Sequence, residues 1–286
     1  MFMKKKTIFI STVALLIGAM IMAKSFIFTI PLKPELIELT PDSMDYKTGC
    51  AEFDESKPID RDGTINVLVW NIYKQQKQDW EPALRKLTQK ADLVLLQEAS
   101  LTPELKAFII DKSYSAELVR AFDVFDTSAG VLSLAKVQAE RACAHTAIEP
   151  WLRLPKSALL SEYALSNDES LMVVNVHAIN FTLGIEDYQR QMSDLEKEVK
   201  NHVGPLILAG DFNSWSSARL EALDQEVARL RLKEVRFTPD ERMIFMTGLP
   251  LDHVFYRGLN VKEAHSIKSN ASDHNPLEVS FSLKRP

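Results

Sequence analysis

The sequence has few cysteines and no excess of basic residues, and each shortage excludes a class of protein. Its two cysteines, Cys50 and Cys143, are too few for a cysteine-based zinc finger or an iron–sulfur cluster. They leave room for one disulfide in an oxidising compartment, and the sequence does not decide whether they pair. With 34 basic against 39 acidic side chains and a net charge of −5, the chain has no electrostatic basis for binding nucleic acid over a wide surface. A polyanion would therefore be held locally or through a metal ion.

The composition is that of a folded protein without repeats or low-complexity tracts. Of its 286 residues, 46% are hydrophobic and 26% are charged, which is enough to build a core and unlike an intrinsically disordered chain. This length suits one large α/β domain or two small ones.

A basic and then apolar segment begins the chain. Three lysines precede an apolar run from Thr7 to Ala23, whose roughly 17 residues lie at the lower limit for crossing a membrane. We expect residues 1–30 to form an uncleaved anchor in the inner membrane of the bacterial cell envelope, with membrane association through residues 4–30 and the domain outside. Export after signal cleavage is an alternative, although Ile21 fits a cleavage site poorly. Another alternative is translation from Met44, which gives a cytoplasmic protein.

The remaining chain divides into a linker and one folded domain. Residues 31–62 are rich in Pro, Asp, Glu, Lys and Ser without clear periodicity, which predicts a linker. Residues 63–286 alternate short β-branched runs with amphipathic stretches, which predicts a single α/β domain. Strands are expected at Thr64–Trp70, Asp92–Gln97, Gly130–Leu134, Ala158–Glu162, Leu171–His177, Pro205–Ala209, His253–Tyr256 and Leu277–Ser282, and helices after Thr102, over Glu186–Lys200 and over Ser216–Leu230.

Polar side chains stand at the ends of several expected strands. Asn71, Glu98 and His177 each follow an apolar run, and Asp211 and Asn213 follow another. Any one of them alone would be read as a turn former or a solvated cap, which is the common role of such residues after a strand. Because strand ends of an α/β sheet deliver side chains to a rim, we expect the set to converge.

Six short motifs carry a resemblance to a known family. They are Trp70-Asn71, Leu96-Gln97-Glu98, Asn175-Val176-His177, Gly210-Asp211-Phe212-Asn213, Leu251-Asp252 and Ser272-Asp273-His274-Asn275-Pro276. In this order and spacing the sequence resembles the endonuclease/exonuclease/phosphatase (DNase I-like) superfamily from about Thr64 to Leu283, and within it an uncharacterised bacterial subgroup. The resemblance implies an α/β fold, a four-layer α/β/β/α sandwich of two packed mixed sheets. Runs such as Leu93–Leu96 agree, because they are apolar without alternation, as in strands buried on both faces.

The resemblance also implies a metal site built from oxygen ligands. Glu98 matches the principal metal ligand of the superfamily, with Asn71 beside it and Asp273 contributing directly or through water. Hard oxygen ligands suit Mg²⁺, which needs only one or two carboxylates from the protein. We therefore expect Mg²⁺ as the cofactor, with Mn²⁺ as the alternative.

Further matched residues carry the catalytic roles that the resemblance implies. His274 matches the general base and Asp252 the carboxylate that orients its ring, an arrangement that stabilises the imidazolium formed when water gives up a proton. Asp211 and Asn213 match the pair that contacts the attacking water and a phosphoryl oxygen. Asp211 is also a second candidate base, because the sequence does not apportion proton transfer between it and His274.

Two more residues match positions near the scissile phosphate, and one position departs from a known pattern. His177 and Asn180 lie where relatives place polar groups beside the phosphate. Tyr73 stands where abasic-site endonucleases carry an Asp, which weakens the case for a second nearby metal and for that substrate.

The resulting expectation is a Mg²⁺-dependent phosphodiesterase or phosphatase that acts as a monomer. Its substrate would be a phosphoester in a nucleic acid, a phospholipid headgroup or a phosphorylated metabolite. The alternative from a different class is a catalytically silent binding or scaffold protein on the same fold.

Overall fold

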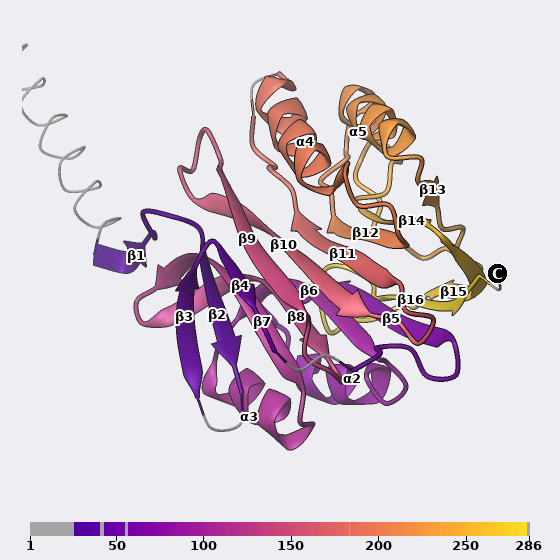
Figure 1. Ribbon diagram of the computed structural model, residues 1–286. Helices are drawn as coiled ribbons and strands as arrows, with labels where there is room; N and C mark the ends of the chain where they lie inside the picture. Colours follow the sequence, from indigo (N-terminus) through magenta and orange to yellow (C-terminus); the bar gives the residue numbers. More distant parts are fainter. Residues whose placement is uncertain (1–25, 41–42, 55–56, 183, 285–286) are drawn as a thin grey trace, which may run out of the picture.

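The computed structural model describes residues 26–40, 43–54, 57–182 and 184–284. Two mixed β-sheets lie face to face in this part of the chain, and helices cover their outer faces (Figure 1). In Figure 1, α4 and α5 lie above one sheet and α2 and α3 lie below the other. The predicted four-layer α/β/β/α sandwich is therefore confirmed.

The first sheet has nine strands and carries α2 and α3 on its outer face. Its order is β15-β16-β5-β6-β8-β7-β2-β3, and β1 pairs with β7. Trp80 and Leu84 of α2 and Phe108 of α3 pack against Leu68 and Leu96 of the sheet. The elements are β1 (Phe28–Thr29), β2 (Glu35–Leu39), β3 (Met44–Thr48), β5 (Thr64–Asn71), β6 (Leu93–Ser100), β7 (Ser115–Val124), β8 (Thr127–Ala135), β15 (Leu259–Ser266), β16 (Leu277–Leu283), α2 (Trp80–Leu87) and α3 (Pro103–Asp111).

The second sheet has seven strands in the order β13-β14-β12-β11-β10-β9-β4 and carries α4 and α5. Tyr188 and Met192 of α4 and Leu223 of α5 pack against Val174 and Leu208 of this sheet. The elements are β4 (Cys50–Glu52), β9 (Arg141–Ile148), β10 (Pro155–Ala164), β11 (Ser170–His177), β12 (Leu206–Asp211), β13 (Lys233–Glu234), β14 (Asp252–Arg257), α4 (Glu186–Val199) and α5 (Ser217–Arg229).

The main core lies between the two sheets. Val67 and Val69 of β5 point into it with Val173 and Ile207 of the facing sheet. Successive residues of a strand point to opposite faces, so Leu68, between the two valines, packs under the helices instead. Both faces of the central strands are thus buried, and this is why their sequences are apolar without alternation.

Residues 31–62, which were expected to form a linker, contain three strands instead. In place of an irregular connection, β2 and β3 form a hairpin that pairs with β7, and β4 pairs with β9 of the other sheet. The linker prediction is wrong because the charged and proline-rich composition hides one short apolar strand. Leu36 and Ile37 of that strand are fully buried.

The two cysteines form a disulfide between β4 and β9. Cys50 and Cys143 are directly opposite each other in the strand register, and their Cα atoms are 4.0 Å apart. The bond joins positions 93 residues apart in the sequence. It therefore ties β4, the edge strand of the second sheet, to its neighbour β9.

Most of the segment predicted as an anchor or signal, residues 1–25, lies outside the described residues. Within the residues that the structure describes, no helix combines the length and the apolar character needed to cross a membrane.

Candidate active site

Strand register places the expected polar residues at one edge of the sandwich. In the first sheet, parallel β5 and β6 set Asn71 beside Gln97. In the second, parallel β11 and β12 set His177 beside Asp211, and β14 runs antiparallel so that its first residue, Asp252, also faces Asp211. The two sheet edges meet, because Asn71 Nδ2 donates a hydrogen bond of 3.0 Å to Asp211 Oδ2.

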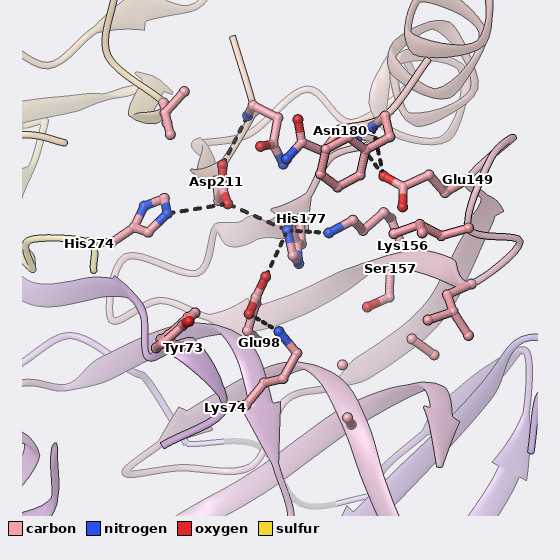
Figure 2. A pocket seen from close by; sticks show the side chains of 18 of the residues that line it. Tyr73, Lys74, Glu98, Glu149, Lys156, Ser157, His177, Asn180, Asp211 and His274 are labelled. Atoms are coloured by element: carbon pink, nitrogen blue, oxygen red, sulfur yellow. Dashed lines mark hydrogen bonds and ion pairs between the residues drawn. The ribbon is translucent and has the colours of Figure 1, made fainter. Parts of the chain in front are cut away.

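These side chains surround a cavity of about 610 Å³ (Figure 2). Of the nine residues proposed from the sequence, seven line it. The other two, Asn71 and Asp252, lie behind the lining residues. Asn71 contacts Asp211, and Asp252 contacts His274. The lining members are Glu98, His177, Asn180, Asp211, Asn213, Asp273 and His274.

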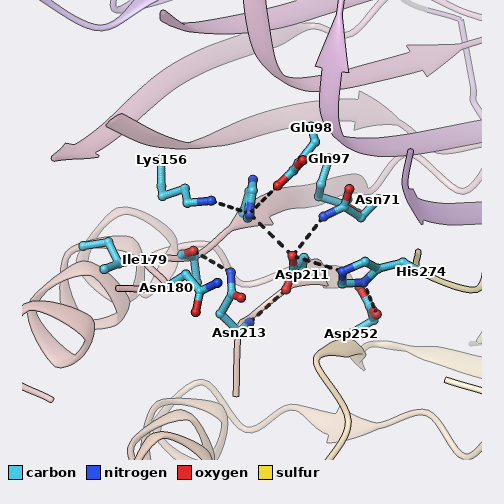
Figure 3. A network of polar contacts seen from close by, with 12 residues as sticks. Asn71, Gln97, Glu98, Lys156, Ile179, Asn180, Asp211, Asn213, Asp252 and His274 are labelled. Atoms are coloured by element: carbon cyan, nitrogen blue, oxygen red, sulfur yellow. Dashed lines mark hydrogen bonds and ion pairs between the residues drawn. The ribbon is translucent and has the colours of Figure 1, made fainter. Parts of the chain in front are cut away.

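His274 and Asp252 form a buried pair. The Nδ1 atom of His274 lies 2.7 Å from Asp252 Oδ2, and its Nε2 atom faces Asp211 Oδ2 at 4.0 Å (Figure 3). Burial alone would lower the pKa of His274, but the adjacent carboxylates of Asp252 and Asp211 outweigh it and raise the pKa to about 10. The ring is therefore held in one orientation, with Nε2 directed toward the cavity.

Two hydrogen bonds attach the loop of His274 to the end of β5. Trp70 Nε1 donates to the carbonyl oxygen of His274 at 2.9 Å, and Ser272 Oγ donates to the carbonyl oxygen of Asn71 at 2.7 Å. The loop is more than 200 residues from β5 in the sequence. These buried contacts explain how it is positioned against the first sheet. Asp273, between the two anchored residues, is exposed at the cavity.

Asp211 is the centre of the polar network in Figure 3. Besides the bond from Asn71, its Oδ1 accepts from the backbone N–H of Asn213 at 2.9 Å, and His177 Nε2 lies 3.4 Å from its Oδ2. Burial raises the pKa of Asp211 to about 6; the charge of His274 opposes this shift and that of Asp252 adds to it. A carboxyl group with a pKa near neutrality is suited to proton transfer at neutral pH.

Asn213 and Asn180 are both held by their neighbours. Asn213 has a φ of +48°, a conformation that Asn tolerates better than most residues, and its Nδ2 donates to the carbonyl oxygen of Ala178. Asn180 accepts a bond from Trp215 Nε1 at 2.9 Å, and its backbone N–H donates to the buried carboxylate of Glu149. Each amide therefore has a fixed orientation at the cavity wall.

A β-bulge turns Glu98 toward the cavity. The pairing of β6 with β8 shifts register between Leu96 and Ala99, and Glu98 within this interval has a φ of +52°. For a residue with a side chain this left-handed conformation is uncommon and costs free energy, and such positions cluster at functional sites. The carboxylate of Glu98 forms an ion pair with Lys74.

Lys74 reaches Glu98 from an unusual turn. The turn, Tyr73–Gln75, follows β5, and its three residues have φ values of +50°, +52° and +56°. Gln75 fixes it by bonding to both the N–H and the carbonyl oxygen of Ser100. This turn occupies the segment in which the sequence departs from the abasic-site endonuclease pattern.

A partly buried lysine contacts His177, and no sequence motif indicates it. Lys156 Nζ lies 2.8 Å from His177 Nε2 and lines the cavity (Figure 2). Burial, followed by the charges of Lys156 and Lys74, holds the pKa of His177 well below its usual range, so the ring is neutral. A neutral Nε2 facing an ammonium accepts the bond. In this arrangement Lys156, and not His177, is the hydrogen-bond donor of the pair.

Gln97 and Asn175 belong to the matched motifs but do not line the cavity. Gln97 Nε2 donates to Asn175 Oδ1 at 2.7 Å, and Asn175 Nδ2 donates to the carbonyl oxygens of Leu96 and Leu132. Both amides are fully buried between the sheets. They therefore connect the two sheets directly behind the site.

The donor set at the cavity fits a hard divalent cation. Glu98 and Asp273 offer carboxylate oxygens on its wall, and Glu98 already attracts a cation, the ammonium of Lys74. Asp211, Asp252 and His274 also bring ligand atoms within 4.8 Å of one another. The ring of His274 is already bonded to Asp252, and imidazole is less suited to Mg²⁺ than oxygen. The oxygen ligands are the better fit.

Comparison with known proteins supports the sequence-based family assignment. Residues 68–274 match the Endonuclease/Exonuclease/phosphatase family. A UPF0294 protein of Vibrio parahaemolyticus is 50% identical over 275 residues, covering 96% of this chain and 98% of that protein.

Solved structures of the same fold are more distant in sequence. An endonuclease/exonuclease/phosphatase from Beutenbergia cavernae is 17% identical with a TM-score of 0.61, covering 77% of this chain and 72% of that one. A mannosyl-6-phosphatase from Bacteroides thetaiotaomicron is 15% identical with a TM-score of 0.59, covering 77% of this chain and all of that one. These two structures share the fold with this chain. The match over residues 68–274 shows that the chain belongs to the Endonuclease/Exonuclease/phosphatase family.

Proposed function

We propose that this protein is a Mg²⁺-dependent phosphodiesterase or phosphatase. Its family membership already places it among metal-dependent hydrolases of phosphoesters. The observation that carries the finer proposal is the opening of the His274–Asp252 pair and of Glu98 onto one cavity. A phosphoester needs its anionic oxygens neutralised and a water activated at the same phosphorus atom, and this cavity has groups of both kinds.

The metal would be held by Glu98 and Asp273, with Asn71 behind them. When bound, Mg²⁺ supplies positive charge to the phosphoryl oxygens. Mn²⁺ accepts the same oxygen ligands and is the alternative cofactor.

The chain's own residues then divide the remaining work. Two groups are candidates for taking the proton of the attacking water. Asp211, with a pKa of about 6, is deprotonated at neutral pH. His274, oriented by Asp252, has its pKa raised to about 10 by the adjacent carboxylates, and it would act as the base once the charge of a bound cation offsets them. Asn213 and Asn180 present fixed amides to the water and a phosphoryl oxygen. Lys156 adds a partly buried positive charge beside His177.

Hydrolysis of bis-p-nitrophenyl phosphate by the full chain with added Mg²⁺ tests the proposal. EDTA should abolish activity, and Glu98→Gln and His274→Ala should each lower kcat/KM by about a hundredfold or more. His265→Ala is the matched control, because His265 is an exposed histidine outside the cavity. If both site variants keep wild-type activity, the assignment is wrong.

The same assay separates the enzyme from a silent scaffold protein on this fold. A scaffold would show no hydrolysis with Mg²⁺ or Mn²⁺ and no binding of either ion in a calorimetric titration. Retention of Glu98, Asp211, Asp252 and His274 around one cavity favours the enzyme.

We also propose that the domain works in the cell envelope, either anchored or exported. The Cys50–Cys143 disulfide supports this, because disulfides persist in oxidising compartments and are rare in the cytoplasm. Alkylation of unfolded protein taken directly from cells tests it: envelope protein should carry no free thiols until it is reduced. Two free thiols before reduction would favour the cytoplasmic alternative.

A further inference from the structure

The cavity continues well beyond the groups that would hold a phosphate. Its volume of about 610 Å³ lies within the range of pockets for drug-sized ligands, roughly 300 to 1,000 Å³. One end carries Glu98, His177 and His274. The walls leading away from that end are apolar; they include Phe122, Leu154, Phe181, Trp215, Met243 and Phe245.

Apolar side chains also crowd the mouth of this cavity. Leu152, Phe181 and Phe245 line it while remaining 50%, 48% and 43% exposed. They come from three separate segments: the β9–β10 loop, the loop after β11 and the loop before β14. Further exposed apolar residues adjoin them in sequence, namely Ile148, Trp151, Ile244 and Met246. A concentration of exposed apolar side chains at a binding site indicates an apolar ligand or surface.

The charges around the cavity do not suit a nucleic-acid strand. Within the described residues, its lining contains two lysines and no arginine. Lys74 is paired with Glu98 and Lys156 contacts His177, so both lie at the phosphoryl end. A strand of nucleic acid needs a basic track along its successive phosphates, and the described residues that line the cavity do not form one.

One aromatic ring of this wall, that of Trp215, is already covered on part of its surface. The guanidinium of Arg219 lies 4.7 Å from the ring of Trp215, and Phe245 contacts the same ring at a centroid distance of 6.1 Å. Trp215 therefore offers a nucleobase no free face for stacking, although Phe181 stays exposed at the mouth. A hydrocarbon chain needs only apolar contact and can follow the wall as it stands.

From this geometry we propose that the substrate is a phospholipid, a phosphoester that carries long hydrocarbon chains. The phosphate lies at the end formed by Glu98, His177 and His274, and a chain lies along Phe181 and Phe245 toward the exposed mouth. This proposal rests on the proposed function, because it assigns the phosphate to the same catalytic groups.

A homologous series of alkylphosphonates tests the proposal without turnover. Binding of methyl-, butyl- and octylphosphonate to the full chain with Mg²⁺ is measured by calorimetry at concentrations where each ligand is monomeric. Full burial of a methylene group increases affinity about fourfold. Affinity should therefore rise by at least about tenfold from butyl to octyl. A flat series, or no binding by any member, overturns the proposal.

A double variant and a control test whether the hydrocarbon chain lies along the proposed apolar wall. Phe181→Ser combined with Phe245→Ser should remove most of the butyl-to-octyl gain and leave methylphosphonate affinity unchanged. Phe125→Ser is the matched control, since Phe125 is 61% exposed and outside the cavity. All three proteins carry the same residues 1–25, so any contribution from that segment cancels. If the double variant keeps the full gain, the chain does not lie along this wall and the proposal is wrong.

The hydrolysis assay and the phosphonate series together show whether the lipid substrate or the proposed function is wrong. Hydrolysis of bis-p-nitrophenyl phosphate together with a flat phosphonate series contradicts the lipid substrate alone. A rising series without hydrolysis contradicts the proposed function, and with it the role of the lipid as substrate, and leaves the cavity as a binding site for hydrocarbon chains. A short oligothymidylate that binds more tightly than octylphosphonate, and displaces it, would assign the cavity to single-stranded nucleic acid instead.

Discussion

Replacement of Glu117 by Gln should stabilise the protein at alkaline pH and have little effect at acidic pH. Glu117 lies on β7 opposite Glu38 of β2, and its side chain is fully buried. Ser115 Oγ donates to its Oε1 at 2.9 Å, whereas its Oε2 has no hydrogen-bond partner among the described residues. Burial, supported by the nearby charge of Glu38, raises the pKa of Glu117 from 4.5 to about 7.

The sign of the effect follows from proton binding. Between pH 4.5 and about 7, the folded protein keeps a proton on Glu117 that the unfolded chain has released. Stability therefore falls as the pH rises through this interval. The difference between the two pKa values corresponds to about 3 kcal/mol of lost unfolding free energy at pH 8.5 and above. Gln resembles the protonated carboxyl group and never becomes charged, so Glu117→Gln avoids this loss.

Urea unfolding at pH 5 and pH 8.5 measures the effect. The advantage of Glu117→Gln over wild type should be larger at pH 8.5 than at pH 5 by about 2.5 kcal/mol, because a small part of the loss has already occurred at pH 5. All other groups titrate alike in both proteins, so the comparison isolates this one position. Glu263→Gln, at an exposed position of β15, should show no such difference. An advantage for Glu117→Gln that does not change with pH would refute the reasoning.

Three further predictions concern single contacts. Lys156→Met should lower kcat/KM for a phosphodiester by about tenfold or more, because it removes a charge-assisted donor beside His177, and Lys156→Arg should retain part of the activity in the same assay. Replacement of Cys50 and Cys143 by Ala should lower the unfolding free energy by about 2–4 kcal/mol in urea titrations, because the bond closes a long loop. Thr102→Ala should cost about 1 kcal/mol in such titrations, because Thr102 Oγ1 caps α3 by accepting from the N–H of Leu105. A loss below about 0.3 kcal/mol for Thr102→Ala would contradict the capping role.

The central part of the fold could be predicted because its sequence pattern is strong. The eight expected strands all form, as do the helices after Thr102, over Glu186–Val199 and over Ser217–Arg229. Central strands such as β6 and β12 are buried on both faces, so their sequences are largely unbroken apolar runs. Several of the strands that were not predicted lack this signal. β15 has several exposed polar residues, β3 is almost entirely exposed, and β7 is largely buried but is interrupted by charged residues.

The order of the motifs predicts that the site residues lie close together, but it does not predict the direction in which each side chain points. Asn71, His177 and Asp211 are placed by strand register, which apolar runs indicate in advance. Glu98 is different, because it depends on a bulge and a left-handed φ that no local residue signals. Lys156 was missed for a related reason: a lysine before an apolar strand normally points to solvent.

The hairpin and short strand at the start of the domain determine where the protein can be shortened. A fragment that begins at residue 63 would leave β7 and β9 without their neighbours β2 and β4, and unpaired sheet edges promote aggregation. A product that begins at Met44 would keep β3 and β4 but lose Leu36 and Ile37 from the interior. A well-behaved truncated version should therefore begin before Glu35, the first residue of β2.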